Sequence, residues 1–225
     1  MPESLSQINA AIVQCEKCPR LVEWRQQVAR EKRAAFRDWD YWGRPVPGFG
    51  DPNADLLVVG LAPAAHGGNR TGRVFTGDRS GDWLYGALYR AGYANQRTSA
   101  SRDDGLELRG AYVSACVRCA PPANRPTPAE RDHCLPYLDR ELRALHDVRT
   151  ILCLGAFAYN GVAQVLGMKR RPRFGHAVEV EVPDGLLVLC SFHPSQQNTF
   201  TRRLTEPMFD EIFRRARARS AHELS

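Results

Sequence analysis

The chain has 225 residues, of which 43% are hydrophobic and 25% are charged, and this composition is typical of a soluble protein with one large domain. No apolar run is long enough to span a bilayer, and the N-terminal residues lack the basic and apolar regions of a secretory signal, so we expect a cytoplasmic protein without a membrane partner. The formal charge of +6 favours a polyanionic partner such as nucleic acid. The seven cysteines are expected to be buried or metal-bound instead of paired in disulfides.

The expected elements alternate between helices and strands. The chain opens with a short amphipathic helix over 1–14 and a charged helix from Leu21 to about Arg37. The stretch 38–52 is rich in Gly, Pro and aromatic residues, which predicts an ordered irregular loop. A buried strand follows at 56–59, and after it a Gly-rich loop and a helix that follows Asp78.

The rest of the chain continues this alternation. Strands are predicted at 111–116, 150–154 and 186–190, a weaker strand at 177–182, and helices over 127–146, 155–166 and 205–219. Four apolar strands separated by helices predict an α/β protein with a parallel or mostly parallel sheet and helices on both faces. The loops 60–78, 116–126 and 191–198 should then meet at the carboxyl edge of the sheet, where open α/β sheets bind ligands.

The loop after the first apolar strand carries the densest group of chemically useful side chains. Arg70, Arg73, Phe75 and Asp78 follow one another closely there. Neither G-x-G-x-x-G nor G-x-x-x-x-G-K-[ST] is present, which argues against a loop that binds nucleotide phosphates. The arginines suit a phosphodiester backbone, the aromatic ring suits a flat base and the carboxylate suits a charged intermediate, so we predict a site instead of an ordinary turn.

Four cysteines form a candidate metal site. Cys15 and Cys18 have the C-x-x-C spacing of a chelate, and Cys119 and Cys134 supply two more thiols. Cys116 has the same spacing to Cys119, but it ends a strand where a buried side chain is expected, so it is only a substitute for Cys119. Four thiolates suit either structural zinc or an iron–sulfur cluster, and the second knuckle of a zinc ribbon is missing.

Four blocks of sequence, in this order along the chain, resemble one known family. They read CEKCPRL, GLAPAAHGGNRTGRVFTGD, VRCAPPANRPTPAE and HPSQQN, and they resemble uracil-DNA glycosylases of the iron–sulfur-containing family 5 group, also called type b. The resemblance extends from Cys15 to about Met208. It implies one domain over 1–225 with an N-terminal iron–sulfur element, built as a three-layer α/β/α sandwich around a four-stranded, mostly parallel sheet. It also implies a structural [4Fe-4S] cluster on the four cysteines named above.

The resemblance further implies an activity. Enzymes of this group flip a damaged base out of DNA and hydrolyse the N-glycosidic bond, which leaves an abasic site for base excision repair. The expected partners are double- and single-stranded DNA with uracil or related damaged bases, and the protein is expected to act as a monomer on the nucleoid. Cleavage of the DNA strand itself is not expected, because the predicted enzyme is monofunctional.

The expected site residues fall into three sets. Asp78 and His193 match the catalytic residues of the family pattern. The base pocket is expected to contain Gly60, Ala62, Ala64, Phe75 and Asn124: the loop from Gly60 to Ala65 positions water, Phe75 stacks on the base, and Asn124 binds the pyrimidine edge. The predicted DNA contacts are Ser195, Gln196, Gln197 and Asn198, which match the part of the family that presses into the minor groove, and Arg70, Arg73 and Arg202, which are chosen for their charge.

The first loop departs from other glycosylase families in two ways. Those families place Asp, Glu or Asn where Leu61 and Ala62 stand here, and neither of these side chains accepts a proton, so the identity of a general base stays open. The uracil-specific members have a bulky Tyr where Ala64 falls here. The small side chain leaves room beside C5 of a pyrimidine, which predicts a broad range of bases.

Two other classes of protein stay open at this point. One is a non-catalytic iron–sulfur protein that binds abasic or single-stranded DNA, against which the combination of Asp78, Asn124 and His193 speaks. The other is a zinc-ribbon module that binds nucleic acid.

Overall fold

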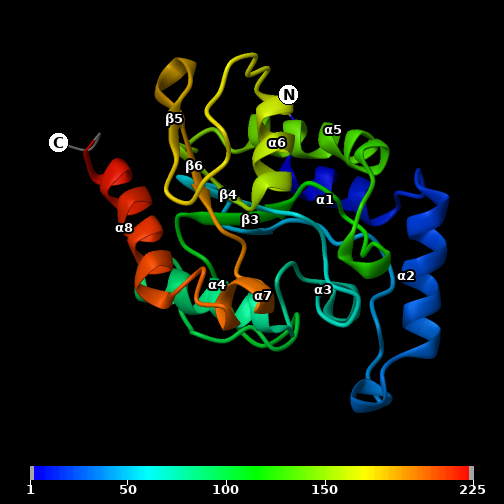
Figure 1. Cartoon of the computed structure of the whole chain (residues 1–225). Coiled ribbons are helices and arrows are strands. Elements are labelled where there is room, and N and C mark those ends of the chain that lie inside the picture. The colour runs from blue at the N-terminus through cyan, green and yellow to red at the C-terminus, as the bar shows by residue number, and fades with distance from the viewer. Residues whose placement is uncertain (1–2, 223–225) are drawn as a thin grey trace.

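The sheet of this protein has six strands in the order β1-β3-β2-β4-β6-β5. The structure, a computed structural model, describes residues 3–222 (Figure 1). The four central strands are parallel and comprise β3 (Ala111–Ala115), β2 (Leu56–Gly60), β4 (Thr150–Leu154) and β6 (Leu187–Ser191). Two short antiparallel strands close the edges, β1 (Phe49–Gly50) beside β3 and β5 (Glu179–Glu181) beside β6. The four predicted apolar strands and the weaker one are therefore confirmed, whereas β1 lies in a stretch expected to be irregular.

Helices cover both faces of the sheet. All residues of the four parallel strands are buried, because alternate side chains point to opposite faces and each face is covered. On one face α4 (Arg79–Arg90) and α8 (Glu206–His222) pack against side chains such as Val58. On the other face α5 (Pro128–Ala144) and α6 (Ala156–Val165) pack against side chains such as Leu57. In Figure 1 α5 and α6 lie above the sheet and α4 below it, which confirms the three-layer sandwich.

Two helices precede the sheet. α1 (Leu5–Val13) packs on α5 through Ile8 and Ile12. α2 (Pro19–Glu31) is shorter than the predicted helix, because Lys32 adopts a φ of 54° and the chain continues into the 3-10 turn η1 (Ala34–Phe36). Residues 1 and 2 of the first predicted helix lie outside the described residues. Within residues 3–222 none of the helices is both long and apolar enough to cross a membrane.

Four short elements occur where only loops were expected. They are α3 (Gly68–Thr71), α7 (Gln196–Phe200) and the 3-10 turns η2 (Pro122–Asn124) and η3 (Pro183–Gly185). α3 and α7 are too short to show a helical hydrophobic period, so the sequence pattern does not mark them. Three of the four belong to the loops that the sequence analysis places at the carboxyl edge of the sheet.

A buried ion pair joins the end of β3 to α5. Arg118 donates to Glu141, the Ser114 hydroxyl donates to the same carboxylate at 2.6 Å, and the two charged side chains are 1% and 0% exposed. Replacing Glu141 with Leu leaves the Arg118 charge buried without its partner. We expect the free energy of unfolding, measured by urea titration, to fall by about 3–5 kcal/mol.

The matched control removes both charges. Arg118→Met combined with Glu141→Leu should recover most of the loss, since neither variant side chain needs a charged partner. A double variant as unstable as the single one would show that lost packing, and not the unpaired charge, causes the effect.

Candidate functional site

The loops that follow β2, β3 and β6 leave the sheet from the same edge. Gly60 at the end of β2 pairs with Ala115 at the end of β3, and Ser191 at the end of β6 pairs with Leu154 of β4. Because all four strands are parallel, the loops 60–78, 116–126 and 191–198 begin together, as the sequence analysis expects. Figure 1 shows α3 and α7, from the first and last of these loops, on the lower side of the molecule.

Phe75 lies over the carboxyl end of β2 in a strained conformation. Its φ is 50°, which is unusual for a bulky side chain. A Cβ atom on Gly60 would lie 2.6 Å from the Phe75 ring, so the ring occupies space that only glycine leaves free at the end of this strand. Backbone strain of this kind is concentrated at functional sites, which is consistent with a ring held in place for a ligand.

His193 lies next to this ring. The Phe75 and His193 ring centroids are 5.8 Å apart at an angle of 31°. The Asn198 side-chain amide donates to the His193 carbonyl at 2.8 Å, and the Phe192 N–H donates to Nδ1 of His176 at 3.3 Å, so both sides of the turn are fixed. Part of the His193 side chain stays exposed, yet the protein atoms packed around it lower its pKa to about 4. The imidazole is therefore neutral near pH 7.

This pKa makes a prediction about acid stability. With an ordinary pKa of 6.5 and a folded value of about 4, His193 takes up a proton in the unfolded chain before it does so in the folded one. Stability should therefore fall as the pH drops from 6.5 towards 4, and His193→Gln should weaken that dependence. Urea titrations across this range, with the imidazole followed by NMR, measure both effects. A His193 that titrates between pH 6 and 7 would contradict the prediction.

Asp78 closes the same loop from its other end. Its side chain caps α4 by accepting the Gly81 N–H at 3.0 Å. A Cβ on Gly67 would lie 2.1 Å from Asp78 Oδ2, so the carboxylate rests directly against the backbone of the loop. Burial raises the pKa of the Asp78 carboxyl, and the backbone N–H groups of Gly81 and Ser80 oppose that rise. The carboxylate thus contributes both to the helix cap and to the loop.

The four predicted metal-binding thiols gather on one side of this edge. Cys119 and Cys134 are buried in one cluster and Cys18 packs against it. One guanidinium nitrogen of Arg25 contacts both the Cys15 carbonyl and the Cys119 sulfur, so the backbone of Cys15 lies close to this cluster. Burial, followed by the charges of Cys134, Glu130 and Cys15, raises the pKa of Cys18 to about 11. In the described part of the chain no three His, Cys, Asp or Glu side chains have the geometry of a site for a single metal ion, so the case for a bound group rests on the gathering of the four thiols.

Cys116 belongs to a different core cluster from Cys119 and Cys134. Its side chain is buried against α6, where it donates to the Ala158 carbonyl at 3.8 Å. A Cβ on Gly161 would lie 2.5 Å from the Cys116 sulfur, so the thiol fills the space that this glycine leaves. The structure therefore favours Cys119 over Cys116 as the third member of the set.

Arg25 of α2 connects the thiol cluster to the loop after β2. Its Nη1 donates to the Cys119 sulfur at 3.3 Å and to the Cys15 carbonyl at 3.4 Å. Its own carbonyl accepts the Asn69 side-chain amide at 3.2 Å. Because Asn69 belongs to α3, the cysteine-bearing segment and the loop that holds Asp78 are joined through one residue.

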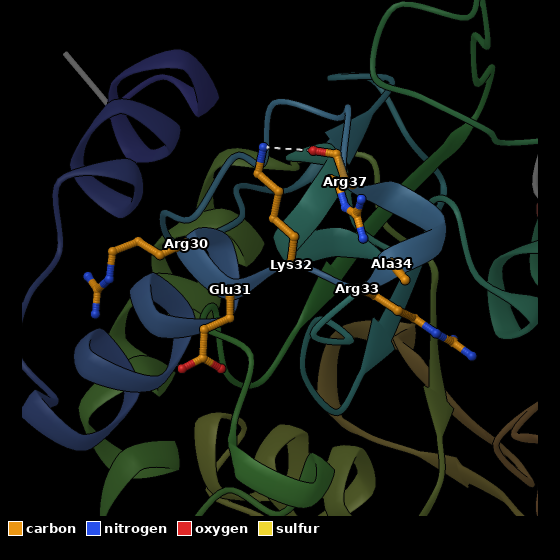
Figure 2. Close-up of a pocket in the computed structure, with 6 residues that line it drawn as sticks. All are labelled: Arg30, Glu31, Lys32, Arg33, Ala34 and Arg37. Atoms are coloured by element: carbon orange, nitrogen blue, oxygen red, sulfur yellow. Dashed lines mark hydrogen bonds between the residues drawn. The ribbon is translucent and has the colours of Figure 1, made fainter.

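A separate surface hollow of about 370 Å³ lies at the end of α2 (Figure 2). It is lined by Arg30, Glu31, Lys32, Arg33, Ala34 and Arg37. Figure 2 shows that the charged side chains fan outwards, and one of them, Lys32, donates to the Arg37 carbonyl at 3.2 Å. The hollow offers no aromatic ring to a base, so the pair of Phe75 and His193 is the better candidate for a base site.

Comparison with known proteins then decides the family. The model of the uracil DNA glycosylase superfamily matches residues 47–217, which is most of the chain. The chain belongs to this superfamily. Within the superfamily the chain is similar to a type-5 uracil-DNA glycosylase of Mycobacterium tuberculosis, with 54% identity over 217 residues, which cover 95% of this chain and 81% of the relative.

More distant members give a consistent result. A type-5 uracil-DNA glycosylase of Thermus thermophilus is 48% identical over 204 residues, which cover 90% of this chain and 92% of the relative. A type-4 uracil-DNA glycosylase of Archaeoglobus fulgidus is 34% identical over 157 residues, which cover 69% and 62%. The higher identity to the type-5 relatives places the chain in the type-5 group of the superfamily, as the resemblance of its four sequence blocks implies.

One prediction for this superfamily member is wrong: Arg70 and Arg73 are not placed to contact DNA phosphates. Each is 3% exposed. Arg70 donates to the carbonyls of His66 and Gly77 at 2.7 and 2.9 Å, and its guanidinium lies 4.0 Å from the ring centroids of both Phe36 and Trp39. Arg73 pairs with Asp104 at 2.8 Å. Both arginines therefore hold the loop together from inside the protein.

The remaining predicted site residues differ in how closely they join this site. Asn124 is exposed and has a φ of 55°, and its side chain makes no hydrogen bond among residues 3–222. Ser195 caps α7, and Asn198 binds the His193 carbonyl, so these two position the turn. Gln196, Gln197 and Arg202 are exposed and remain free to contact DNA.

The small residues of the first loop are partly engaged elsewhere. Ala62 packs against the cluster that contains Cys119 and Cys134, so its side chain faces the thiols and only its backbone remains for a base pocket. The Ala64 carbonyl accepts the N–H groups of Gly67 and Asn69 at 3.2 and 3.1 Å, which fixes the loop as a tight turn. The Ala64 side chain is half-buried.

Two glycines are needed for this site, and the sequence analysis does not identify them as site residues. Gly67 leaves room for the Asp78 carboxylate, and a Cβ on Gly81 would lie 1.8 Å from the Phe75 carbonyl oxygen. The T-G-D-x-x-G pattern contains Gly81 at the third helical position after the cap, which is an unusual place for glycine and the only signal in the sequence.

Proposed function

We propose that this chain is a monofunctional DNA glycosylase that removes uracil and related damaged bases from DNA by hydrolysis of the N-glycosidic bond. The observation that carries the proposal is the pairing of Phe75 with a neutral His193 at the carboxyl edge of the sheet, in a chain similar to type-5 uracil-DNA glycosylases over nearly its whole length. The product is an abasic site, which base excision repair then processes.

The proposed roles follow from the geometry. A base turned out of the duplex stacks on Phe75, and stacking of this kind is worth about 1–3 kcal/mol per base. The neutral His193 donates a hydrogen bond to O2 of the pyrimidine, where negative charge develops as the bond to the sugar breaks. Asp78 faces the positive charge that develops on the sugar and orients water with the backbone of the loop from Gly60 to Ala65. Asn124 closes over the pyrimidine edge when DNA binds.

The cofactor that we propose is a [4Fe-4S] cluster on Cys15, Cys18, Cys119 and Cys134. The donor set fits, because iron–sulfur clusters take four thiolates. The surroundings fit as well, since Arg25 is 3% exposed, donates to the Cys119 sulfur, and has a buried Nε without a hydrogen-bond partner among the described residues. When bound, the cluster supplies a covalent link between α2 and the loop and helix after β3.

The direct test is a uracil-containing oligonucleotide. After incubation with the protein and treatment with alkali, the strand should break at the uracil, and an oligonucleotide with cytosine at that position should stay intact. Without alkali the strand should stay whole, because a monofunctional glycosylase does not cut the backbone. A non-catalytic binder of abasic or single-stranded DNA gives no break in any of these samples. The same assay on double- and single-stranded substrates, with the oligomeric state measured in parallel, tests the proposal of a monomer that acts on both.

We further propose a broad base specificity, set by the small side chain of Ala64. Ala64→Tyr should suppress excision of hypoxanthine and 5-substituted uracils by about tenfold or more while uracil excision changes less, because one extra steric wall discriminates by about 1–3 kcal/mol. Single-turnover rates on a panel of bases measure the ratio. A wild-type protein that excises uracil alone would show that another wall already closes the pocket.

A further inference from the structure

Arg25 is a deeply buried cation that has no carboxylate partner among residues 3–222. Arg73 and Arg118 are buried to a similar degree, and each pairs with an acidic side chain. Arg70 is equally buried, and its guanidinium lies 4.0 Å from the ring centroids of both Phe36 and Trp39. The side-chain partners of Arg25 are instead the Cys119 sulfur at 3.3 Å and the Cys15 carbonyl at 3.4 Å. Its Nε is buried and makes no hydrogen bond in the part of the chain that the structure describes. This combination calls for a negative charge nearby.

Neutral partners do not balance such a charge. Burial of an ionised group without a counter-charge is strongly unfavourable, and a protonated thiol is only a weak hydrogen-bond acceptor. A metal-bound thiolate, in contrast, carries negative charge and accepts hydrogen bonds at sulfur. The position of Arg25 is thus explained if Cys119 is a ligand and is unexplained if Cys119 is a free thiol.

We propose that Arg25 is the charge partner of the iron–sulfur centre, so that its guanidinium stabilises the negative charge on the sulfur ligands. The inference rests on the proposed [4Fe-4S] cofactor. Hydrogen bonds to the sulfurs and nearby charges set the reduction potential of such clusters. Reduction adds one electron to the centre, so the fixed positive charge of Arg25 favours the reduced form and raises the potential. Arg25 is a positioning and tuning residue, because it touches a ligand and not the base or the sugar.

The test replaces the charge and keeps the volume. Arg25→Met should move the reduction potential, measured by redox titration followed by EPR, to a more negative value than that of the wild type. It should also speed the loss of visible absorbance in the presence of an iron chelator. Arg25→Lys restores a positive charge with fewer hydrogen bonds, so its reduction potential should lie between those of the wild type and Arg25→Met. This variant also keeps the test valid if Arg25→Met fails to assemble a cluster.

The control is another arginine close to the cysteines. Arg20 follows Cys18 by two positions, is 45% exposed and pairs with Glu130 at 2.7 Å, and its hydrogen bonds among the described residues go to Glu130 and the Arg125 carbonyl instead of a thiol. Because its charge is exposed and already paired, Arg20→Met should change the potential and the rate of cluster loss much less than Arg25→Met does. Equal shifts in the two variants would overturn the proposal, as would an unchanged potential in Arg25→Met.

Three different results test the charge-partner role of Arg25, the proposed cofactor and the proposed glycosylase activity. The Asn69 side chain binds the backbone carbonyl of Arg25, so the link to the loop after β2 survives a change of the Arg25 side chain. If the wild-type protein contains neither iron nor acid-labile sulfide, the proposed cofactor is wrong. If the wild-type protein contains iron but does not excise uracil, the proposed glycosylase activity is wrong. Only the comparison of the Arg25→Met and Arg20→Met variants tests whether Arg25 is the charge partner.

Discussion

Asp78→Ala and His193→Ala should each lower the single-turnover rate of uracil excision by about 10²–10⁴-fold, which is the usual contribution of one general acid–base or electrostatic group. His193 lies beside Phe75, and in the proposed mechanism its neutral imidazole meets the charge that develops on the base. The affinity for an oligonucleotide with an abasic-site analogue should stay near the wild-type value, because neither side chain is placed to bind a phosphate. Quenched-flow excision assays and fluorescence anisotropy give the two quantities.

Because Asp78 also caps α4, a second variant is needed to separate a loss of catalysis from a loss of the cap. Asp78→Asn keeps an acceptor for the Gly81 N–H, since Asn and Asp are similarly good N-cap residues, but it removes the charge. If the charge acts in catalysis, Asp78→Asn is as slow as Asp78→Ala although it is more stable. If Asp78→Asn excises uracil at the wild-type rate, Asp78 is a structural cap and the backbone of the first loop must position the water alone.

Loss of a single ligand should remove nearly all bound iron. In Cys119→Ala and Cys134→Ala we expect the visible absorbance of the cluster to disappear and the thermal unfolding midpoint to fall, because metal binding contributes directly to folding free energy. Cys116→Ala is the control, as its thiol packs against Gly161 on α6 and belongs to a different core cluster from Cys119 and Cys134. Iron analysis and thermal melts provide the measurements. A Cys116→Ala variant without a cluster, beside a Cys119→Ala variant that retains one, would reverse the assignment.

The sequence predicts the architecture well because buried parallel strands are distinctive. The runs at 56–59 and 151–154 are apolar throughout, since helices cover both faces of these strands. Once these strands are placed in one parallel sheet, the convergence of the three loops follows. β1, with two residues, is too short to show any period. The end of α2 is missed because the charged pattern continues past Glu31, and only the backbone angle of Lys32 stops the helix.

The site is predicted less completely, for reasons that lie in tertiary structure. A surface arginine and a buried one look alike in sequence, and the partners that bury Arg70 and Arg73 come from separate segments, with Trp39 on one side and Asp104 on the other. The need for Gly67 arises only when Asp78 folds back against it. The sequence predicts that the loops that carry Phe75 and His193 meet, but it predicts neither the contact between the two rings nor the strained backbone of Phe75.

The bond between Asn69 and the Arg25 carbonyl has a consequence for the life of the protein in a cell. Cys15 and Cys18 lie far in sequence from Cys119 and Cys134, so the proposed cluster closes a long loop of chain and lowers the entropy of the unfolded state. The proposed cluster would add to the attachments that α2 already has through buried Leu21 and the Arg20–Glu130 ion pair, and α3 is attached to α2. A cell short of iron would accumulate chains with an intact sheet and a loosened first loop, and its capacity to repair DNA would follow its supply of metal.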